Sequence, residues 1–303
     1  MARRFHTFDV FTKKALTGNG LAIVEDAEGL EADAMQTIAR EFNLSETVFL
    51  FPPENKAHSA RVRIFTPGQE LPFAGHPTVG TGIFLAMQKL GEITREEDAI
   101  ILLEENVGPV RCGVRLRPDE APFAEFDVPS LPSETGAAES RDVIAAALDL
   151  HPEEIGFENH VPTIYSAGNP FTFVPVRNLD VIGRAQIASQ HWDAAFHPVN
   201  NPAAFIYTRD TLNHDAAFHA RMFWPAIGIG EDPATGSAAA AFAAVIMRFD
   251  ELLDGTYTGI IEQGYEMGRP SQIFLEIEVK GGALDGIRIG GHAVPVMSGE
   301  LEL

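Results

Sequence analysis

FTPGQELPFAGHPTVGTGIFLA, residues 65–86, and FWPAIGIGEDPATGSAAAAFAA, residues 223–244, are two similar stretches of this 303-residue chain, and they decide its fold. With a gap of two residues, one alignment pairs Phe65 with Phe223, Pro67 with Pro225, His76 with Asp232, Pro77 with Pro233, Gly80 with Gly236 and Thr81 with Ser237. The two copies lie about half the chain apart, as expected for an internal repeat. The repeat predicts two domains of one design, each with a central helix that is entered from a proline-rich strand end.

Around the repeat, short β-branched and aromatic runs recur and are separated by Gly, Pro, Asn and Asp turns. Helical periodicity is clearest at residues 31–42, 77–91, 140–150 and 233–249. Because strands dominate without regular strand–helix alternation, we expect an α+β fold of mostly antiparallel sheets around a few helices.

A Pro/Ser/Gly-rich segment at residues 128–140 is typical of a connection between domains. We therefore expect a boundary near Ser130, with one domain at residues 1–129 and the other at residues 130–303. In this prediction the last strand of the chain can pack in the first domain instead of the second.

The chain is acidic, with 22 Lys and Arg residues against 43 Asp and Glu residues and a net charge of -21. This charge repels nucleic acid and anionic lipid at long range, so we expect neither as a partner. Cys112 is the only cysteine, which excludes disulfides within one chain and favours a reducing compartment. The start lacks the apolar region of a signal peptide, and the apolar run at residues 238–247 is about half of the ~20 residues that span a bilayer. The expected location is the cytoplasm.

An anionic substrate would need a local positive site, and the two predicted helix starts at Pro77 and Pro233 offer one. Proline suits the first turn of a helix, and Asp232 before Pro233 is a good N-cap. Free N–H groups at a helix N-terminus bind carboxylate or developing negative charge. Gly80 and Gly236 near these starts indicate close backbone approach, either by a ligand or by a packed strand.

Glu46 and His76 are the side chains best placed for proton transfer. Alternation in the strand SETVFLF puts Glu46 at the start of the face that carries Val48 and Leu50, where desolvation would raise a carboxyl pKa. A Glu at a strand end is also commonly just exposed. His76, between Gly75 and Pro77, is suited to relay a proton or simply to cap a helix.

Metal and nucleophile motifs are absent from the sequence. His214 and His219 are five residues apart, out of phase on a helix or a strand, and no HExxH pattern occurs. Ser237 lacks the GxSxG context of a nucleophilic serine. We expect no metal and no cofactor.

Five motifs together resemble the phenazine-biosynthesis PhzF-like family of isomerases, and they run in the family's order through both halves. They are GNGLAIV at residues 18–24, NLSETVF at 43–49, FTPGQELPFAGHPTVGTG at 65–82, GIGEDPATGSAAAA at 228–241 and QGYEMGRPS at 263–271. The resemblance implies the diaminopimelate-epimerase fold, in which two pseudo-symmetric domains each wrap a central helix in a sheet-rich barrel, with the active site in the cleft between them. It also implies a homodimer.

The resemblance further implies Glu46 as the general acid/base, with His76 and Asp232 lining the cleft, and Gly75 and Ser237 as cleft residues. With the helix starts, this gives an expected substrate-binding set of Gly75, Pro77, Thr78, Gly236 and Ser237. Related epimerases exchange the proton between two cysteines, which the loops AGHPT and ATGSA lack. The family usually has Gly-Asn-Pro where this chain has Gly18-Asn19-Gly20, a departure expected to touch no catalytic group.

The predicted function is a cofactor-free isomerase that moves a proton between carbons of a small carboxylate-bearing substrate, cyclic and of the dihydro-hydroxyanthranilate type in the best-understood family member. One alternative is an epimerase that uses Glu46 and His76 as opposed bases. Another is a small-molecule binding protein without turnover, against which the joint presence of Glu46, His76 and Asp232 argues.

Overall fold

The computed structural model describes residues 2–197, 203–227 and 229–303 and divides the chain into two units. Unit 1 comprises the residues up to Pro129 together with Ile289–Leu303, and unit 2 comprises Ser130–Arg288. The last strand, β17 (Ala283–Leu301), therefore begins in unit 2 and ends in unit 1. Gly228, the first residue of the motif GIGEDPATGSAAAA, lies outside the described residues.

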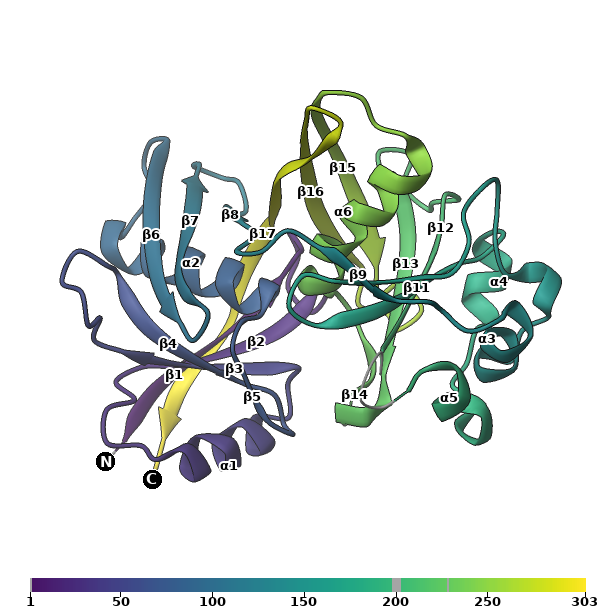
Figure 1. The fold of residues 1–303 in the computed structure, drawn as a ribbon. Coiled ribbons are helices and arrows are strands. Elements are labelled where there is room, and N and C mark those ends of the chain that lie inside the picture. Colours follow the sequence, from purple (N-terminus) through teal and green to yellow (C-terminus); the bar gives the residue numbers. More distant parts are fainter. Residues whose placement is uncertain (1, 198–202, 228) are drawn as a thin grey trace. The chain divides into compact units, whose positions relative to one another are not determined.

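In unit 1 a ring of strands surrounds one helix, α2 (Gly75–Leu90), as Figure 1 shows for the purple to teal part of the chain. The strands are β1 (Arg3–Val10), β2 (Asn19–Val24), β3 (Glu46–Phe51), β4 (Ala60–Phe65), β5 (Glu70–Leu71), β6 (Glu97–Glu105), β7 (Gly108–Leu116), β8 (Phe123–Asp127) and the C-terminal part of β17. Pairing runs β17–β1–β2–β3–β4–β6–β7–β8 and returns to β17, so the sheet closes into a barrel. The β2–β3 and β4–β6 pairs are parallel.

The helix α2 fits inside this barrel because two of its residues are glycines that face packed side chains. A Cβ atom on Gly80 would lie 2.5 Å from Leu21, and one on Gly82 would lie 2.7 Å from the sulfur of Cys112. Both neighbours are fully buried. The close backbone approach predicted at Gly80 is therefore approach to a strand and not to a ligand.

Unit 2 repeats this plan around α6 (Gly236–Asp250). Its strands are β9 (Ser133–Gly136), β10 (Thr163–Ser166), β11 (Pro170–Pro175), β12 (Ala203–Thr208), β13 (Phe218–Trp224), β14 (Ile229–Asp232), β15 (Gly255–Gln263) and β16 (Ser271–Lys280). Pairing runs β9–β10–β11–β12–β13–β15–β16, with β11–β12 and β13–β15 parallel. The short strand β14 forms a hairpin with β13, as β5 does with β4.

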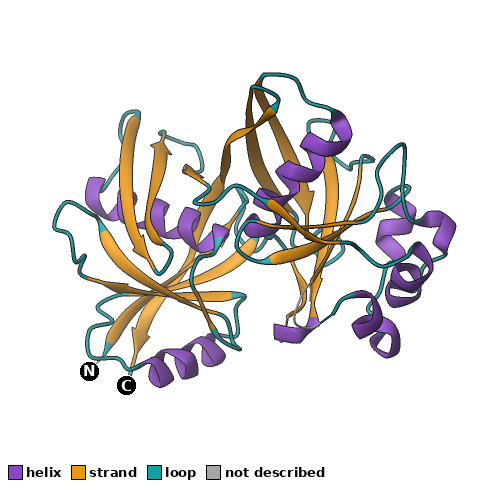
Figure 2. Ribbon diagram, viewed as in Figure 1, coloured by secondary structure: helices purple, strands orange, loops and turns teal. Residues whose placement is uncertain are grey.

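Smaller helices pack outside the central ones (Figure 2). They are α1 (Ala32–Phe42) in unit 1, and α3 (Arg141–Leu148), α4 (Leu179–Arg184), α5 (Ser189–Ala195) and the 3₁₀ turns η1 (Pro152–Glu154) and η2 (Pro225–Ile227) in unit 2. α1, α2, α3 and α6 form in the four segments whose periodicity predicted helices. α4 and α5 were not predicted, because six or seven residues are too few to show a helical period.

Sheet register corrects the alignment of the internal repeat. Phe65 pairs with Glu70, and Phe223 pairs with Glu231, so these residues are counterparts. The counterpart of Asp232 is therefore Leu71. The predicted pairing of His76 with Asp232 is wrong because it made the second copy shorter than the first. In the structure the second copy is longer, since about seven residues separate the paired Phe223 and Glu231 and about four separate the paired Phe65 and Glu70.

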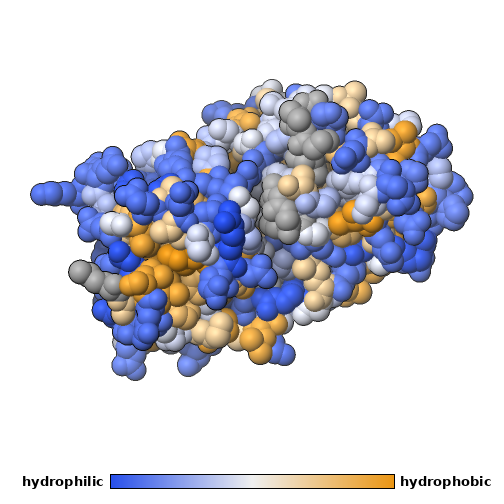
Figure 3. Space-filling model, turned by 90° about the horizontal axis from the view of Figure 1, so that it is seen from below, coloured by the Kyte–Doolittle hydropathy of each residue, from blue (hydrophilic) through white to orange (hydrophobic). Residues whose placement is uncertain are grey.

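Hydrophilic side chains predominate on the face drawn in Figure 3, and hydrophobic ones form separate groups there. No helix in the described part of the chain has the length and apolar character needed to cross a bilayer.

Candidate active site

Glu46 and His76 meet inside unit 1. Glu46 is the first residue of β3, and His76 is the second residue of α2. The Nε2 atom of His76 lies 3.3 Å from Oε2 of Glu46, and their side chains are only 4% and 12% exposed. We call these two residues, with the Asn19 side chain described below, the Glu46 cluster.

Strand alternation explains why Glu46 points to α2. Phe49 and Phe51 pack in a cluster with Met35 and Ile38 of α1, on the outer face of β3. Glu46 stands at odd spacing from both phenylalanines and therefore faces the inside of the barrel, where α2 lies. The predicted division of the strand into two faces is confirmed.

His76 is held as a neutral imidazole. Burial lowers its pKa to about 3, and a hydrogen bond with the backbone of Gly20 opposes this only in part. Its Nδ1 atom also lies 3.3 Å from Nδ2 of Asn19. The expectation that the Gly-Asn-Gly motif touches no catalytic candidate is wrong, because Asn19 and Gly20 both contact His76.

Gly18 makes this contact possible. Its φ angle is +68°, and a Cβ atom there would lie 2.4 Å from the carbonyl oxygen of Val10. Only glycine adopts such a crowded left-handed conformation without strain, so the turn into β2 places Asn19 beside His76.

A buried acid, Glu105, supports the first turn of α2. The Thr78 hydroxyl lies 2.7 Å from Oε1 of Glu105 and 2.8 Å from the carbonyl oxygen of Ala74. Burial raises the pKa of Glu105 to about 8, so at neutral pH the protonated acid donates to Thr78, which in turn donates to Ala74. The hydroxyl of Thr78, predicted to bind substrate, is thus engaged in supporting the helix. Sequence analysis missed Glu105, since a Glu at the end of a strand gives no signal of burial.

In unit 2, Asp232 is linked to the start of α6 by a chain of buried polar groups. Thr235 Oγ1 donates to Oδ2 of Asp232 at 2.6 Å. Nε2 of Gln263 donates to the carbonyl oxygen of Asp232 at 2.7 Å and to Thr235 Oγ1 at 3.2 Å. All three residues are buried. We call them the Asp232 cluster. Thr235 and Gln263 lie within two of the family motifs, but nothing in the sequence indicates that they meet.

Asp232 is not the N-cap of α6, contrary to the prediction. It belongs to β14, where it pairs with Met222 three residues before the N-cap. The N-cap is Thr235 and the first helical residue is Gly236, so Pro233 precedes the helix. Pro77 is the third residue of α2 and not the first.

The two central helices begin alike. Gly75 and His76 are the first two residues of α2, and Gly236 and Ser237 are the first two residues of α6. In the described structure, neither N-cap side chain bonds to the backbone of its helix, because Ala74 has no polar group and Thr235 bonds to Asp232. The first-turn amides of both helices thus lack a cap from the N-cap side chain, and an anion is suited to them.

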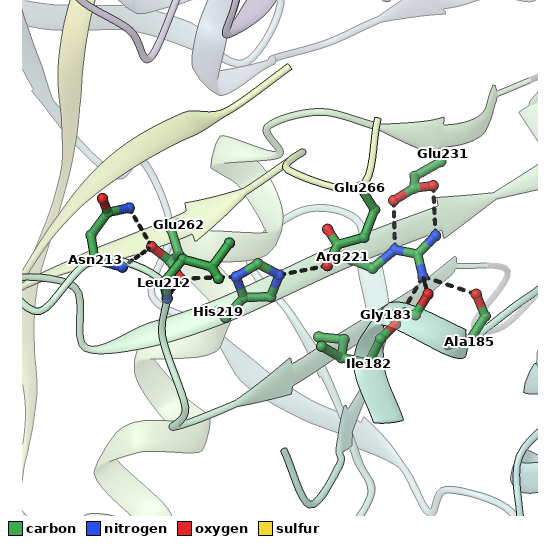
Figure 4. A network of polar contacts seen from close by, with 10 residues as sticks. All are labelled: Ile182, Gly183, Ala185, Leu212, Asn213, His219, Arg221, Glu231, Glu262 and Glu266. Carbon is green, nitrogen blue, oxygen red and sulfur yellow. Dashed lines mark hydrogen bonds and ion pairs between the residues drawn. The ribbon is translucent and has the colours of Figure 1, made fainter. Parts of the chain in front are cut away.

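An ion-pair network joins side chains of β13 and β15 (Figure 4). His219 lies between Glu262 and Glu266, 2.9 Å from each. Glu262 directly precedes Gln263 in β15, so the two side chains point to opposite faces of the strand. Burial disfavours the charged imidazole, yet the two carboxylates together raise the pKa of His219 to about 9. In the sequence His219 was considered only as a metal ligand, and its spacing from His214 did not fit one. In the structure it is a charged residue that forms ion pairs with two carboxylates. The described residues contain no group of three metal-binding side chains.

The structure thus brings Glu46 and His76 together in unit 1. It places Asp232, Gly236 and Ser237 on the loop and first turn of α6 in unit 2. Of the predicted substrate-binding residues, Gly75, Pro77, Thr78 and Gly236 are buried, whereas Ser237 is partly exposed.

Comparison with known proteins agrees with this architecture. Residues 8–299 match the model of the phenazine biosynthesis-like protein family. The chain is 53% identical to an uncharacterized isomerase of Mesorhizobium japonicum, covering 99% of this chain and 98% of the relative. It is 33% identical to the trans-2,3-dihydro-3-hydroxyanthranilate isomerase of Pseudomonas chlororaphis, covering 97% and 98%.

The fold is shared with a crystal structure of the Bacillus anthracis phenazine biosynthesis protein of the PhzF family. The TM-score is 0.88 with 28% identity, and each chain is covered to 100%. The predicted α+β fold, the predicted family and the predicted enzyme class are confirmed by these relatives. This chain belongs to the phenazine biosynthesis-like, or PhzF, family of isomerases.

Proposed function

We propose that this isomerase works without a cofactor and that Glu46 moves a proton from one carbon of a small carboxylate-bearing substrate to another. The observation that carries the proposal is the nearly buried pair of Glu46 and His76, whose facing atoms are 3.3 Å apart. A carboxylate in such a place is suited to general acid/base chemistry. Because burial keeps His76 neutral, it brings no imidazolium charge beside Glu46.

In the first step, the Glu46 carboxylate takes a proton from a C–H bond, and the electron pair of that bond delocalises into the substrate. In the second step, the protonated Glu46 returns the proton to another carbon of the delocalised anion. Atoms and electrons balance without an oxidant or a second substrate. His76 faces Glu46 at 3.3 Å and serves to orient it. Its own pKa of about 3 makes it a poor base.

For the substrate, we propose trans-2,3-dihydro-3-hydroxyanthranilate or a close analogue, because the Pseudomonas chlororaphis relative is named for it. The chain's net charge of -21 opposes binding of an anion at long range. The amides at the start of α2, at Gly75, supply the local positive potential that a carboxylate needs, and those at the start of α6, at Gly236, supply the same potential within unit 2. Asp232 and Ser237 would contact the polar groups of the substrate.

To test this, the substrate is incubated with the protein in heavy water, and the products are identified by mass spectrometry and chiral chromatography. We expect a product of new connectivity, and Glu46→Gln should lower its rate by about 10²–10⁴-fold. Glu41→Gln, an exposed change on α1, is the control and should keep the wild-type rate. A wild-type rate for Glu46→Gln would show that the assigned role is wrong.

The same experiment separates the alternatives. An epimerase would exchange a proton with the solvent and invert one centre while connectivity stays the same. A binding protein would retain the ligand without exchange. The cytoplasmic location and the homodimer remain predictions, and light scattering of the purified protein tests the dimer.

A further inference from the structure

The N-cap residue of α6 does not use its hydroxyl to cap the helix. Threonine at this position commonly accepts a hydrogen bond from a backbone N–H of the first turn. For Thr235 no such bond is found among the described residues. Its hydroxyl instead lies 2.6 Å from Oδ2 of Asp232.

Gln263 determines which way the Thr235 proton points. Its Oε1 atom accepts from the backbone N–H of Thr235 at 3.2 Å, so its Nε2 atom faces the carbonyl oxygen of Asp232 at 2.7 Å and Thr235 Oγ1 at 3.2 Å. A flipped amide would place an oxygen against that carbonyl. Because Nε2 offers only hydrogens, Thr235 Oγ1 accepts from Gln263 and must donate its own proton elsewhere. The acceptor within reach is the Asp232 carboxylate.

The backbone leaves this arrangement little freedom. A Cβ atom on Gly264, which follows Gln263, would lie 2.6 Å from the carbonyl oxygen of Pro233, and its φ angle is +80°. The end of β15 is thus packed directly against the turn that carries Asp232. On the opposite face of β14, both guanidinium nitrogens Nε and Nη2 of Arg221 bind the carboxylate of Glu231 (Figure 4).

We propose that Thr235 and Gln263 are positioning residues for Asp232, which hold its carboxylate ionised and in one orientation. The inference rests on the proposed function, because it takes Asp232 as a residue that contacts the substrate. Hydrogen bonding to the charged form favours that form, and a locked neighbour fixes its geometry. The other charged groups of β13, β14 and β15 are paired on the opposite faces: Arg221 with Glu231, and His219 with Glu262.

The experiment measures the carboxyl pKa of Asp232 by ¹³C NMR, with Asp232→Asn to assign the resonance. Thr235→Val keeps the shape of the side chain but removes the hydroxyl, and we expect it to raise the pKa of Asp232 by about 1. Thr235→Ser restores the hydroxyl and should restore the pKa. Thr256→Val, an exposed change on β15, is the matched control and should leave the pKa unchanged.

Gln263→Glu provides a second test, because a carboxylate there competes for the Thr235 proton and should also raise the pKa of Asp232. An unchanged Asp232 pKa in Thr235→Val, or a serine variant that behaves like the valine variant, would overturn the proposal. In turnover assays we expect Thr235→Val to lower kcat about tenfold and Thr235→Ser to restore it. If the substitutions only damaged folding, the melting temperatures of the valine and the serine variant would both fall.

The titration needs no substrate, so its outcome is independent of the proposed reaction. If Glu46→Gln keeps the wild-type rate while Thr235→Val raises the Asp232 pKa, the proposed function fails and the positioning role stands. If Glu46→Gln is inactive and the Asp232 pKa does not respond, only the positioning role fails.

Discussion

The start of α2 and the start of α6 are built on the same supports but carry different side chains. In unit 1 Arg63 of β4 binds Glu70 of the hairpin strand through two nitrogens, at 2.7 and 2.6 Å. In unit 2 Arg221 of β13 binds Glu231 in the same way, at 2.8 and 2.9 Å. Sheet register makes these two pairs counterparts. Each pair fixes the hairpin that leads into a central helix.

A second support is also repeated. Register along the parallel pairs β4–β6 and β13–β15 makes Glu104 the counterpart of Glu262. Both carboxylates accept hydrogen bonds from two successive backbone amides of the loop before the neighbouring strand and from one histidine. The scaffold thus repeats down to single hydrogen bonds.

The polar groups around the helix starts do not repeat. By register and by position from the helix start, the counterparts are Glu46 and Ala203, Leu71 and Asp232, Ala74 and Thr235, His76 and Ser237, and Glu105 and Gln263. Among the described helix starts, a carboxylate meets an imidazole only at α2, and an aspartate is held by a hydroxyl only at α6. Residues that support the turns are thus repeated, whereas each side chain proposed to meet the substrate occurs in one unit without a counterpart in the other.

The largest expected difference between the units lies in the arginines. Arg221 is buried and also donates to the carbonyl oxygens of Ile182 and Ala185, whereas the side chain of Arg63 is 22% exposed. Arg221→Met should lower the free energy of unfolding by about 3–5 kcal/mol, because it leaves a partly buried carboxylate and two carbonyls without their donor. Arg63→Met should cost about 1 kcal/mol. Urea denaturation of both variants measures this, and equal losses would contradict the greater importance of the unit 2 pair.

The next largest effect concerns Glu105, whose counterpart is the amide Gln263. The folded pKa of Glu105 is about 8 and its ordinary value is 4.5, so between these values the folded state binds a proton that the unfolded state does not. Its contribution to stability is therefore complete below pH 4.5 and is lost as pH rises to about 8. Glu105→Gln should stabilise the protein at pH 8.5 by roughly 2–4 kcal/mol and change little at pH 4.5.

Urea denaturation at several pH values tests this prediction, with the exposed Glu92→Gln as control. A stability difference between Glu105→Gln and wild type that does not grow with pH would show that Glu105 is ionised in the folded state.

The smallest expected effect comes from a glycine in α2 that has no glycine counterpart in α6. α2 has Gly80 where α6, counted from its first residue, has Ala241, and both positions are buried. Gly80→Ala should destabilise unit 1 by about 1–3 kcal/mol, because the new methyl group would overlap Leu21 and Val10. Ala241→Gly should cost about 1 kcal/mol from helix propensity. Thermal melting of both variants measures the effects, and a stabilising Gly80→Ala would mean that the barrel has room beside α2.

Much of the fold was predictable, since motif order identified the family and periodicity located the two central helices. The site was predictable in part. Glu46 and His76 follow from the motifs and strand alternation, and their contact agrees with the expectation that they act together. Gly80 was ambiguous, because close approach looks the same in sequence whether a ligand or Leu21 is the neighbour.

The alignment of the repeat failed because glycine, alanine and proline match too easily. Which residue faces Asp232 depends on the pairing of β14 with β13, and a hairpin of different length shifts that pairing without changing the motif. Thr235 and Gln263 lie 28 residues apart and meet only because β15 ends beside the turn before α6. Glu105 likewise becomes a buried acid only once α2 covers the end of β6.

The family, the two-part plan and the chemical types at the helix starts can therefore be predicted from the amino-acid sequence, because they depend on local pattern and motif order. Which polar groups share a proton, and which are ionised, becomes clear only in the folded chain. That division has a physical reason: hydrogen-bond partners and pKa values depend on burial and on neighbours distant in the chain, which no local pattern records.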